Sequence, residues 1–239
     1  MAREDRLKKL REEVYRANME IVQRGLVIHT FGNASGIDRE SGTVVIKPSG
    51  VDYGELSPEN MVAVDLDYRV IEGDLNPSSD TKTHVFLYRA FLKIGGIVHT
   101  HSRYATAWAQ AGRPLPCLGT THADYFFGEI PCTAPMSDDQ IARDYEEETA
   151  VQIVATFRNR DYERISGVLA AGHGPFTWGN TPAEAAFNSF ILEHIAELNL
   201  ITCAINPEIG PIGKALLDKH YLRKHGSSAT YGQREGRSR

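Results

Sequence analysis

The sequence predicts an α/β fold in which helices flank a mainly antiparallel or mixed sheet. Short β-branched runs alternate with longer helical patterns along the chain, and several of the runs are joined by short turns. This interspersed order favours helices packed on the faces of one sheet. The 239 residues include 41% hydrophobic side chains, enough for one large domain with its own core. We therefore expect a single domain over residues 1–239, with a short flexible tail at about 234–239.

The first part of the chain predicts a helix followed by turn-linked strands. Apolar residues at helical spacing between residues 7 and 22 indicate an amphipathic helix that ends at Gly25. Residues 26–30 would begin the first strand, and residues 31–36 would form a polar, glycine-containing turn after it. Further strands are expected at residues 43–46, 61–65 and 70–71, within 95–102, and at 167–171.

Capping signals mark where several of the later helices begin. Pro77 and the Ser/Ser/Asp cluster after it signal a helix start near residue 81. Ser137 and Thr181 each open a capping box, in which two side chains satisfy free N–H groups of the first turn. The helices expected in the second half of the chain cover about residues 104–111, 137–157, 182–200 and 212–224.

Composition and charge exclude several classes of protein. The formal net charge is −5, and the one Arg-rich stretch is a short C-terminal tail, so nucleic acid is not an expected partner. No apolar run approaches the roughly 18–20 residues needed to cross a bilayer, and the charged N-terminus does not resemble a signal peptide. The three cysteines are widely spaced, which disfavours a disulfide framework or a thiolate zinc site. We expect a cytoplasmic protein.

A pair of histidines at the end of a predicted buried strand is the strongest chemical signal. Ile97 and Val98 are β-branched and follow two glycines, which is typical of a buried strand. Because side chains two apart on a strand share a face, His99 and His101 would point the same way. Neutral imidazole is a standard ligand for zinc, so the pair predicts a metal site.

Two further residues could complete that site. A catalytic zinc needs three or four nitrogen or oxygen ligands and an open position. His173 lies at another strand end between two glycines, where a ligand can approach, and Asp80 stands at a helix start shortly before the histidine strand. Four of the other histidines fit periodic or helical segments better, and two could serve as second-layer or substrate groups. The first four are His29, His84, His194 and His225, and the last two are His122 and His220.

Three segments could bind an anion such as phosphate. They are the turn at 31–36, the turn at 47–50 and the helix start at 76–81, all rich in glycine, serine or asparagine. Backbone N–H groups in such turns, and at the N-terminus of a helix, can face a negative charge. Each segment also has an ordinary interpretation, as a hairpin turn or as helix capping by Ser79 or Asp80.

Together these stretches resemble the class II aldolase/epimerase family. The resemblance runs from near residue 20 to residue 233, and no single motif would carry it. The matching stretches are FGNAS at 31–35, VIKPSGVDY at 45–53, PSSDT at 77–81, IGGIVHTHS at 94–102, GTTHADYF at 119–126, HGPF at 173–176, LDKHYLRKHG at 217–226 and YGQ at 231–233.

The resemblance implies a fold, roles for individual residues and an assembly. The implied fold has three layers, with a mainly antiparallel or mixed sheet between helices. By position, the resemblance implies the metal ligands Asp80, His99, His101 and His173. It implies substrate and phosphate contacts at Gly32, Asn33, Ser49, Gly50, Ser78 and Ser79. It also implies an acid/base pair, Asp124 and Tyr231, and accessory active-site positions at Lys47 and His220. Family members are homotetramers with active sites at subunit interfaces, which would bring Tyr231 to a neighbour's metal.

The implied activity is epimerisation of a ketopentose phosphate at C4 through cleavage and re-formation of a carbon–carbon bond. The cofactor would be a divalent metal, most simply Zn²⁺, although Mn²⁺ and Co²⁺ also use imidazole and carboxylate ligands. One alternative is a sugar-phosphate aldolase, which shares the histidines but carries a glutamate where Asp80 stands. The second alternative is a non-catalytic module with a structural zinc, and the third is an epimerase of a different pentose or ascorbate pathway.

Overall fold

A seven-stranded sheet forms the centre of the molecule. The structure is a computed structural model that describes residues 2–226 and residue 229. The strand order is β4-β3-β2-β1-β5-β7-β6, and every neighbouring pair is antiparallel. The strands are β1 (Asn33–Asp38), β2 (Thr43–Ile46), β3 (Val62–Val64), β4 (Val70–Glu72), β5 (Gly96–His99), β6 (Gly167–Ala170) and β7 (Gly174–Gly179).

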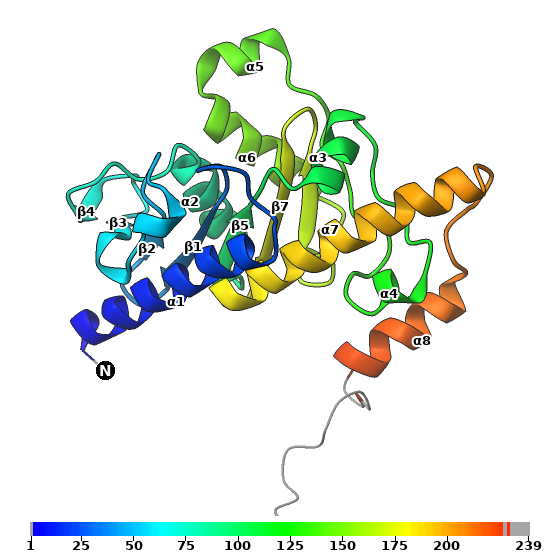
Figure 1. Ribbon diagram of the computed structural model, residues 1–239, viewed down its shortest axis with the longest axis horizontal. Helices are drawn as coiled ribbons and strands as arrows, with labels where there is room; N and C mark the ends of the chain where they lie inside the picture. The colour runs from blue at the N-terminus through cyan, green and yellow to red at the C-terminus, as the bar shows by residue number, and fades with distance from the viewer. Residues whose placement is uncertain (1, 227–228, 230–239) are drawn as a thin grey trace, which may run out of the picture.

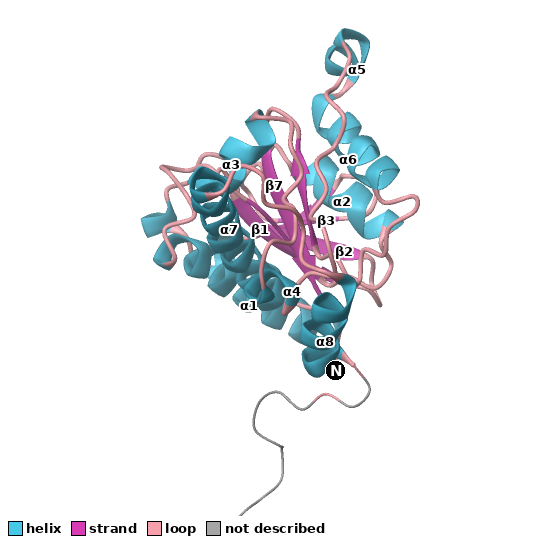
Figure 2. Ribbon diagram, turned by 90° about the vertical axis from the view of Figure 1, so that its right-hand side faces the viewer, coloured by secondary structure: helices cyan, strands magenta, loops and turns pink. Residues whose placement is uncertain are grey.

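Helices cover both faces of this sheet and give three layers, as the sequence predicted (Figures 1 and 2). One face carries α1 (Arg3–Gln23), α3 (Arg103–Gln110) and α7 (Pro182–Ile205), and the other carries α2 (Thr81–Ala90) and α6 (Tyr145–Thr156). The remaining elements are α4 (Thr120–Ala123), α5 (Asp138–Arg143), α8 (Lys214–His225) and the short 3₁₀ turns η1 (Tyr53–Glu55) and η2 (Pro58–Asn60). No helix of the described residues is long and apolar enough to cross a membrane.

Alternation along the strands explains why both faces can be covered. Ile97 of β5 packs with Tyr88 and Trp178 on the side of α2, whereas its neighbour Val98 packs with Ala17 and helices α1 and α7 on the other side. Successive strand side chains point to opposite faces, so a strand that is apolar at both positions must lie between two layers.

The first strand does not lie where the sequence predicted it. Residues 26–30 form turns rather than a strand, and β1 begins at Asn33, within the predicted turn. Positive φ angles at Gly25 (69°), His29 (55°) and Gly32 (86°) turn the chain repeatedly before β1 can start. The strand looks like a turn because its residues are small, and the packing demands this: a Cβ at Gly36 would lie 2.7 Å from Leu10 of α1.

Three other elements differ from prediction. The helix expected over 137–157 is divided at Asp144, which has extended backbone angles and caps α6 by accepting a hydrogen bond from the Glu147 N–H at 3.2 Å. The predicted capping box at Ser137 is present and opens the shorter α5. Helix α7 continues past the predicted residue 200 to Ile205. Strand β7 was not predicted, because its glycines and proline are typical of a turn.

A candidate metal centre

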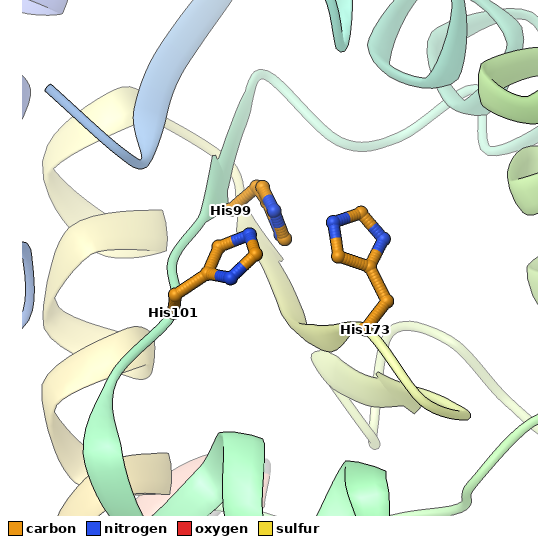
Figure 3. Close-up of side chains that lie close together, drawn as sticks. All are labelled: His99, His101 and His173. Atoms are coloured by element: carbon orange, nitrogen blue, oxygen red, sulfur yellow. The ribbon is translucent and has the colours of Figure 1, made fainter.

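Three imidazoles meet at one end of strand β5. His99 is the last residue of β5, His101 lies two residues further on, and His173 lies in the turn between β6 and β7. One ring nitrogen of each histidine lies within 4.8 Å of those of the other two. The ring centroids are 4.5 to 5.0 Å apart, and the rings point toward a common centre (Figure 3). The structure therefore brings together the three predicted histidine ligands.

Strand register and a close backbone approach create this meeting point. Strand β5 pairs with β1 and β7 on its two sides, so that His99 stands opposite Asn33 and Phe176. The turn that carries His173 comes close to the end of β5 because Gly174 has no side chain. A Cβ there would lie 2.7 Å from the Thr100 carbonyl oxygen, which no ordinary residue could tolerate.

The His99 ring is oriented as a metal ligand would be. Its Nδ1–H donates to the Pro175 carbonyl oxygen at 2.9 Å, and the ring stacks on Phe176 with 4.1 Å between centroids. A carbonyl bond to one ring nitrogen fixes the tautomer and leaves the lone pair on the other nitrogen. That other nitrogen, Nε2, is buried and has no hydrogen-bond partner within the described part of the chain. A divalent cation would satisfy this otherwise unfavourable buried acceptor.

The surroundings keep the other two imidazoles neutral. Burial, followed by repulsion from His99, lowers the pKa of His173 to about 3. Burial, followed by the same neighbour, also lowers the pKa of His101. Only a deprotonated imidazole can bind a metal, so both are ready to do so at neutral pH. Three imidazole nitrogen donors at this spacing fit a borderline ion such as Zn²⁺.

Asp80 lies beside the three imidazoles and is held by a hydrogen bond. It is the first flanking residue of α2, and its Oδ2 accepts from Asn33 Nδ2 at 2.7 Å. Its side chain does not cap the helix, contrary to one interpretation of the sequence. Among the described residues, the grouped ligand atoms belong to the three histidines, so the fourth-ligand role of Asp80 stays a prediction. Burial raises its pKa, but His99, His84 and Asn33 together hold that pKa below its usual value.

The candidate phosphate contacts come from turns that are joined to one another. The Ser49 N–H donates to the Asn76 carbonyl at 2.9 Å, and the Ser78 N–H donates to the Lys47 carbonyl at 3.0 Å. Asn33 adds a third connection, since its Nδ2 also donates to Ser78 Oγ at 3.1 Å. Three of the predicted contacts, Ser49, Gly50 and Ser79, are exposed, whereas Asn33 and Ser78 are buried and Gly32 is half-buried. The predicted contacts thus surround Asp80 and the end of β1.

Lys47 is buried and ties two of these loops together. Its Nζ donates to the carbonyl oxygens of Val51 at 3.0 Å, Pro48 at 3.3 Å and Thr30 at 3.4 Å. Burial lowers its pKa, and Asp52 partly opposes this shift. These three acceptors account for all three ammonium hydrogens. The structure gives Lys47 a clear part in holding the loops, and its accessory role in the active site stays a prediction.

The predicted acid/base residue Asp124 sits in a separate cluster of charges. Its carboxylate accepts from His220 Nδ1 at 3.0 Å and from Arg223 at 2.7 and 3.1 Å, while Lys224 Nζ lies 3.9 Å away. Burial raises the pKa of Asp124, but the bonds from Arg223 and His220 outweigh it and hold that pKa below its usual value. The predicted acid/base residue Asp124 and the predicted accessory residue His220 are therefore in direct contact.

Within one chain this charge cluster does not join the imidazoles. Asp124 follows α4 and His220 lies on α8, and both helices lie apart from α3, which directly follows His101 (Figures 1 and 2). Tyr231, the other predicted acid/base residue, lies outside the described residues. The structure thus divides the predicted site into two parts carried by different elements.

The sequence interpretation missed His84 as a neighbour of the site. It lies one helical turn after Asp80, is fully buried, and its Nδ1 lies 2.7 Å from Ser35 Oγ. Burial lowers its pKa to about 3, so it remains neutral. The i, i+4 spacing from Asp80 could have indicated that both residues share a helix face. Phe31 was also not singled out, although its ring lies 5.8 Å from that of His101.

An antiparallel sheet between two helical layers, with a three-imidazole centre at the end of a middle strand, defines a class II aldolase fold. The chain belongs to the family of the class II aldolase and adducin N-terminal domain, whose model matches residues 12–200. It is accordingly an enzyme of the class II aldolase superfamily, a group that uses a divalent metal. The three histidines supply residues that could bind one.

Solved structures agree with this assignment. An L-fuculose 1-phosphate aldolase superimposes with a TM-score of 0.78 at 24% identity, over 90% of this chain and 95% of the other. YgbL from Klebsiella pneumoniae, described as a candidate aldolase, epimerase or decarboxylase, is 28% identical with a TM-score of 0.69, over 89% and 98%. L-Fuculose-1-phosphate aldolase from Thermus thermophilus is 26% identical with a TM-score of 0.66, over 85% and 98%.

Proposed function

We propose that the protein is an L-ribulose-5-phosphate 4-epimerase, which interconverts L-ribulose 5-phosphate and D-xylulose 5-phosphate in the cytoplasmic breakdown of a pentose such as L-arabinose. The observation that carries this proposal is the contact between Asp124 and His220, on elements separate from the imidazoles. An epimerase must move protons on both faces of an aldehyde, so it needs acid/base groups beyond its metal centre.

The chemistry of the substrate explains why bond cleavage is required. The hydrogen on C4 is not next to the C2 carbonyl, so its removal would leave a carbanion without a means of delocalisation. The C4 hydroxyl is β to that carbonyl, and a retro-aldol cleavage of C3–C4 is therefore available. It gives glycolaldehyde phosphate and the three-carbon enediolate of dihydroxyacetone. Rotation of the aldehyde and re-addition to its other face inverts C4.

The residues around β5 would hold the ketone fragment. His99, His101 and His173 would bind the divalent metal, which supplies Lewis-acid stabilisation of the negative charge that develops on this fragment. Zn²⁺ fits the three imidazoles, and Mn²⁺ or Co²⁺ are further candidates. Asp80 would add a carboxylate oxygen if it turned from Asn33, and its negative charge would lessen the positive charge of the site.

The joined turns would hold the phosphate while the aldehyde fragment rotates. Ser49, Gly50 and Ser79 present exposed backbone or hydroxyl donors, and Asn33 and Ser78 stand behind them. These donors are neutral, and a phosphate dianion can be bound by several of them at once. An anchored phosphate would act as a pivot and keep the fragment at high effective concentration.

Asp124 and Tyr231 would each serve one face of the aldehyde. One would remove the C4 hydroxyl proton before cleavage, and the other would protonate the opposite alkoxide after re-addition. The lowered pKa of Asp124 keeps its carboxylate ionised and therefore free to accept a proton, although it also makes the group a weaker base. Because Asp124 and the imidazoles lie on separate parts of one chain, we propose a homotetramer in which Asp124 and Tyr231 complete the site of a neighbour.

One assay tests the proposal. Purified protein is incubated with L-ribulose 5-phosphate, with and without a chelator, and D-xylulose 5-phosphate is measured by a coupled reaction. We expect product formation that the chelator abolishes and added Zn²⁺ restores. An Asp124→Asn variant should retain the metal and lose most of the activity. Absence of product from a metal-loaded tetramer would exclude the epimerase.

A sugar-phosphate aldolase is the second candidate, and two of the three similar structures named above are L-fuculose-1-phosphate aldolases. This enzyme would release dihydroxyacetone phosphate from L-fuculose 1-phosphate. Asp80 disfavours it, since the aldolase relatives are expected to carry a glutamate there. Release of dihydroxyacetone phosphate, or of free glycolaldehyde phosphate as the main product from L-ribulose 5-phosphate, would favour the aldolase.

A further inference from the structure

Helix α3 connects two of the three candidate metal ligands. His101 directly precedes Ser102, the residue that flanks the N-terminus of this eight-residue helix. Near its other end, the Ala109 carbonyl accepts a hydrogen bond at 2.9 Å from the N–H of Gly172, the residue before His173. The position of α3 therefore influences both His101 and the turn that carries His173.

The placement of His101 depends more on α3 than the placement of His99 does. His99 is held by strand pairing on both sides and by the bond from its ring to Pro175. Strand β5 ends at His99, so its ladder of hydrogen bonds does not extend to His101. The backbone of His101 must therefore be fixed by the next element of the chain, which is the N-terminus of α3.

The N-terminus of α3 is capped from another element of the fold. Ser102 occupies the capping position, yet its side chain makes no capping bond within its own helix. Its hydroxyl instead donates to Glu193 Oε2 at 2.7 Å. The same carboxylate accepts the N–H of Tyr104 at 2.8 Å and the N–H of Ala105 at 2.9 Å. A carboxylate bonded to free N–H groups at the positive end of a helix is a favourable arrangement.

Glu193 lies on α7, a 24-residue helix that packs against the middle of the sheet. A second bond fastens α3 to the same helix, since Trp108 Nε1 donates to the Ala196 carbonyl at 3.1 Å. Together these bonds fix α3 to a rigid part of the core. We propose that Glu193 is a positioning residue for the metal ligand His101, acting through the N-terminus of α3. This inference rests on the proposed metal centre, which it deepens.

The test compares Glu193 with a carboxylate of the same helix that performs a similar task elsewhere. Glu184 accepts the Asn180 N–H at 2.8 Å, close to the start of α7 and away from the imidazoles. The variants are Glu193→Ala, Glu193→Gln and Glu184→Ala, each made in the full chain. Zinc affinity is measured by competition with a chromophoric chelator. The visible spectrum of the Co²⁺-loaded protein reports ligand geometry, and thermal unfolding of the metal-free protein reports stability.

We expect Glu193→Ala to weaken zinc binding by about 10- to 100-fold, as loss of groups that orient metal ligands commonly does. The cobalt spectrum should change as well. Glu193→Gln retains an acceptor oxygen for part of the helix N-terminus, so its affinity should lie between those of Glu193→Ala and the wild type. Glu184→Ala should bind zinc as the wild type does, with an unchanged cobalt spectrum, whatever its effect on unfolding.

The opposite results would overturn the inference. Zinc affinity of Glu193→Ala equal to that of Glu184→Ala, with an unchanged cobalt spectrum, would reduce Glu193 to an ordinary stabilising residue. If Glu193→Ala does not fold, Glu193→Gln decides by the same criteria. If the wild-type protein binds zinc and the Glu193 variants bind it with equal affinity, only this inference is overturned. A wild-type protein that binds no divalent metal overturns the proposed function as well.

Discussion

The imidazole centre at the end of β5 and the Asp124 cluster between α4 and α8 use opposite means to prepare a reactive group. His101 and His173 are kept neutral by their lowered pKa values, and His99 retains a buried ring nitrogen without a partner among the described residues. Asp124 is ionised and is surrounded by His220, Arg223 and Lys224. The first region offers unused lone pairs to a cation, whereas the second has its charge already compensated. This difference supports the proposal that the first region binds the metal and the second moves protons.

The largest effect is expected from removing a metal ligand of the first region. His99→Ala should abolish stable metal binding and lower kcat by about 10³-fold or more, equivalent to roughly 4 kcal/mol of transition-state stabilisation. Metal content after dialysis and the rate of product formation would be measured together. His194→Ala removes an exposed histidine of α7 and should leave both unchanged. A His99→Ala protein that keeps its metal and its rate would contradict the assignment of this centre.

The second region can be tested without disturbing the first. Asp124→Asn preserves the shape of the side chain but removes the charge, and should lower kcat by about 10²- to 10⁴-fold, as loss of a general acid or base does. Metal content should equal that of the wild type, because the imidazoles do not contact Asp124. Loss of metal in Asp124→Asn, or an unaltered rate, would show that the two regions do not divide the work in this way.

The structural role of Lys47 in holding the loops can be tested separately from a catalytic role. Lys47→Met fills a similar volume but leaves three carbonyl acceptors without their donor, and should lower the free energy of unfolding by about 1–3 kcal/mol. Urea denaturation of the metal-free protein measures this loss. Because the loops carry the candidate phosphate contacts, KM should also rise, while metal content stays unchanged. Unfolding at the same urea concentration as the wild type would assign Lys47 to chemistry alone.

The smallest effect at neutral pH is expected from His122, a buried histidine on α4 in the second region. Burial lowers the pKa of His122 from 6.5 to about 4, although its ring donates from Nε2 to the Gly128 carbonyl at 2.7 Å. The unfolded chain therefore binds one proton more than the folded chain between those two values. Stability from this group is complete above pH 6.5, falls as the pH drops, and is lost below about 4.

His122→Gln retains an amide donor near that carbonyl and removes the titration. The slope of unfolding free energy against pH should decrease by up to about 1.4 kcal/mol per pH unit between the two pKa values. The measurement is urea unfolding of metal-free protein from pH 7 to pH 4.5. His84 and His173 continue to titrate in both proteins, so a residual slope should remain. Identical slopes would show that His122 is not a buried neutral group.

Sequence reasoning succeeded where local pattern and local geometry coincide. The fold class, the strand at 43–46 and the capping box of Ser137 are confirmed. Thr181 caps α7 as predicted, but the Glu184 carboxylate accepts the N–H of Asn180 rather than that of Thr181, so the second capping box is only half formed. It failed at β1 and β7, whose glycines and small polar residues are typical of turns. At Gly36 and Gly174 the residue must be glycine because other elements approach the backbone closely, and residues adjacent in the sequence do not reveal this approach.

The sequence by itself indicated which chemistry the protein could carry: imidazoles spaced to meet, neutral donors in turns and, by resemblance, an acid/base pair of Asp124 and Tyr231. The tertiary structure alone decided which of these groups share a site. Strand register brought His173 to His99, whereas Asp124 went with His220 to another part of the chain. It also revealed Glu193, because a carboxylate 92 positions after His101 can act on it only once α7 packs beside α3. Residue type is local, but proximity depends on how the layers pack.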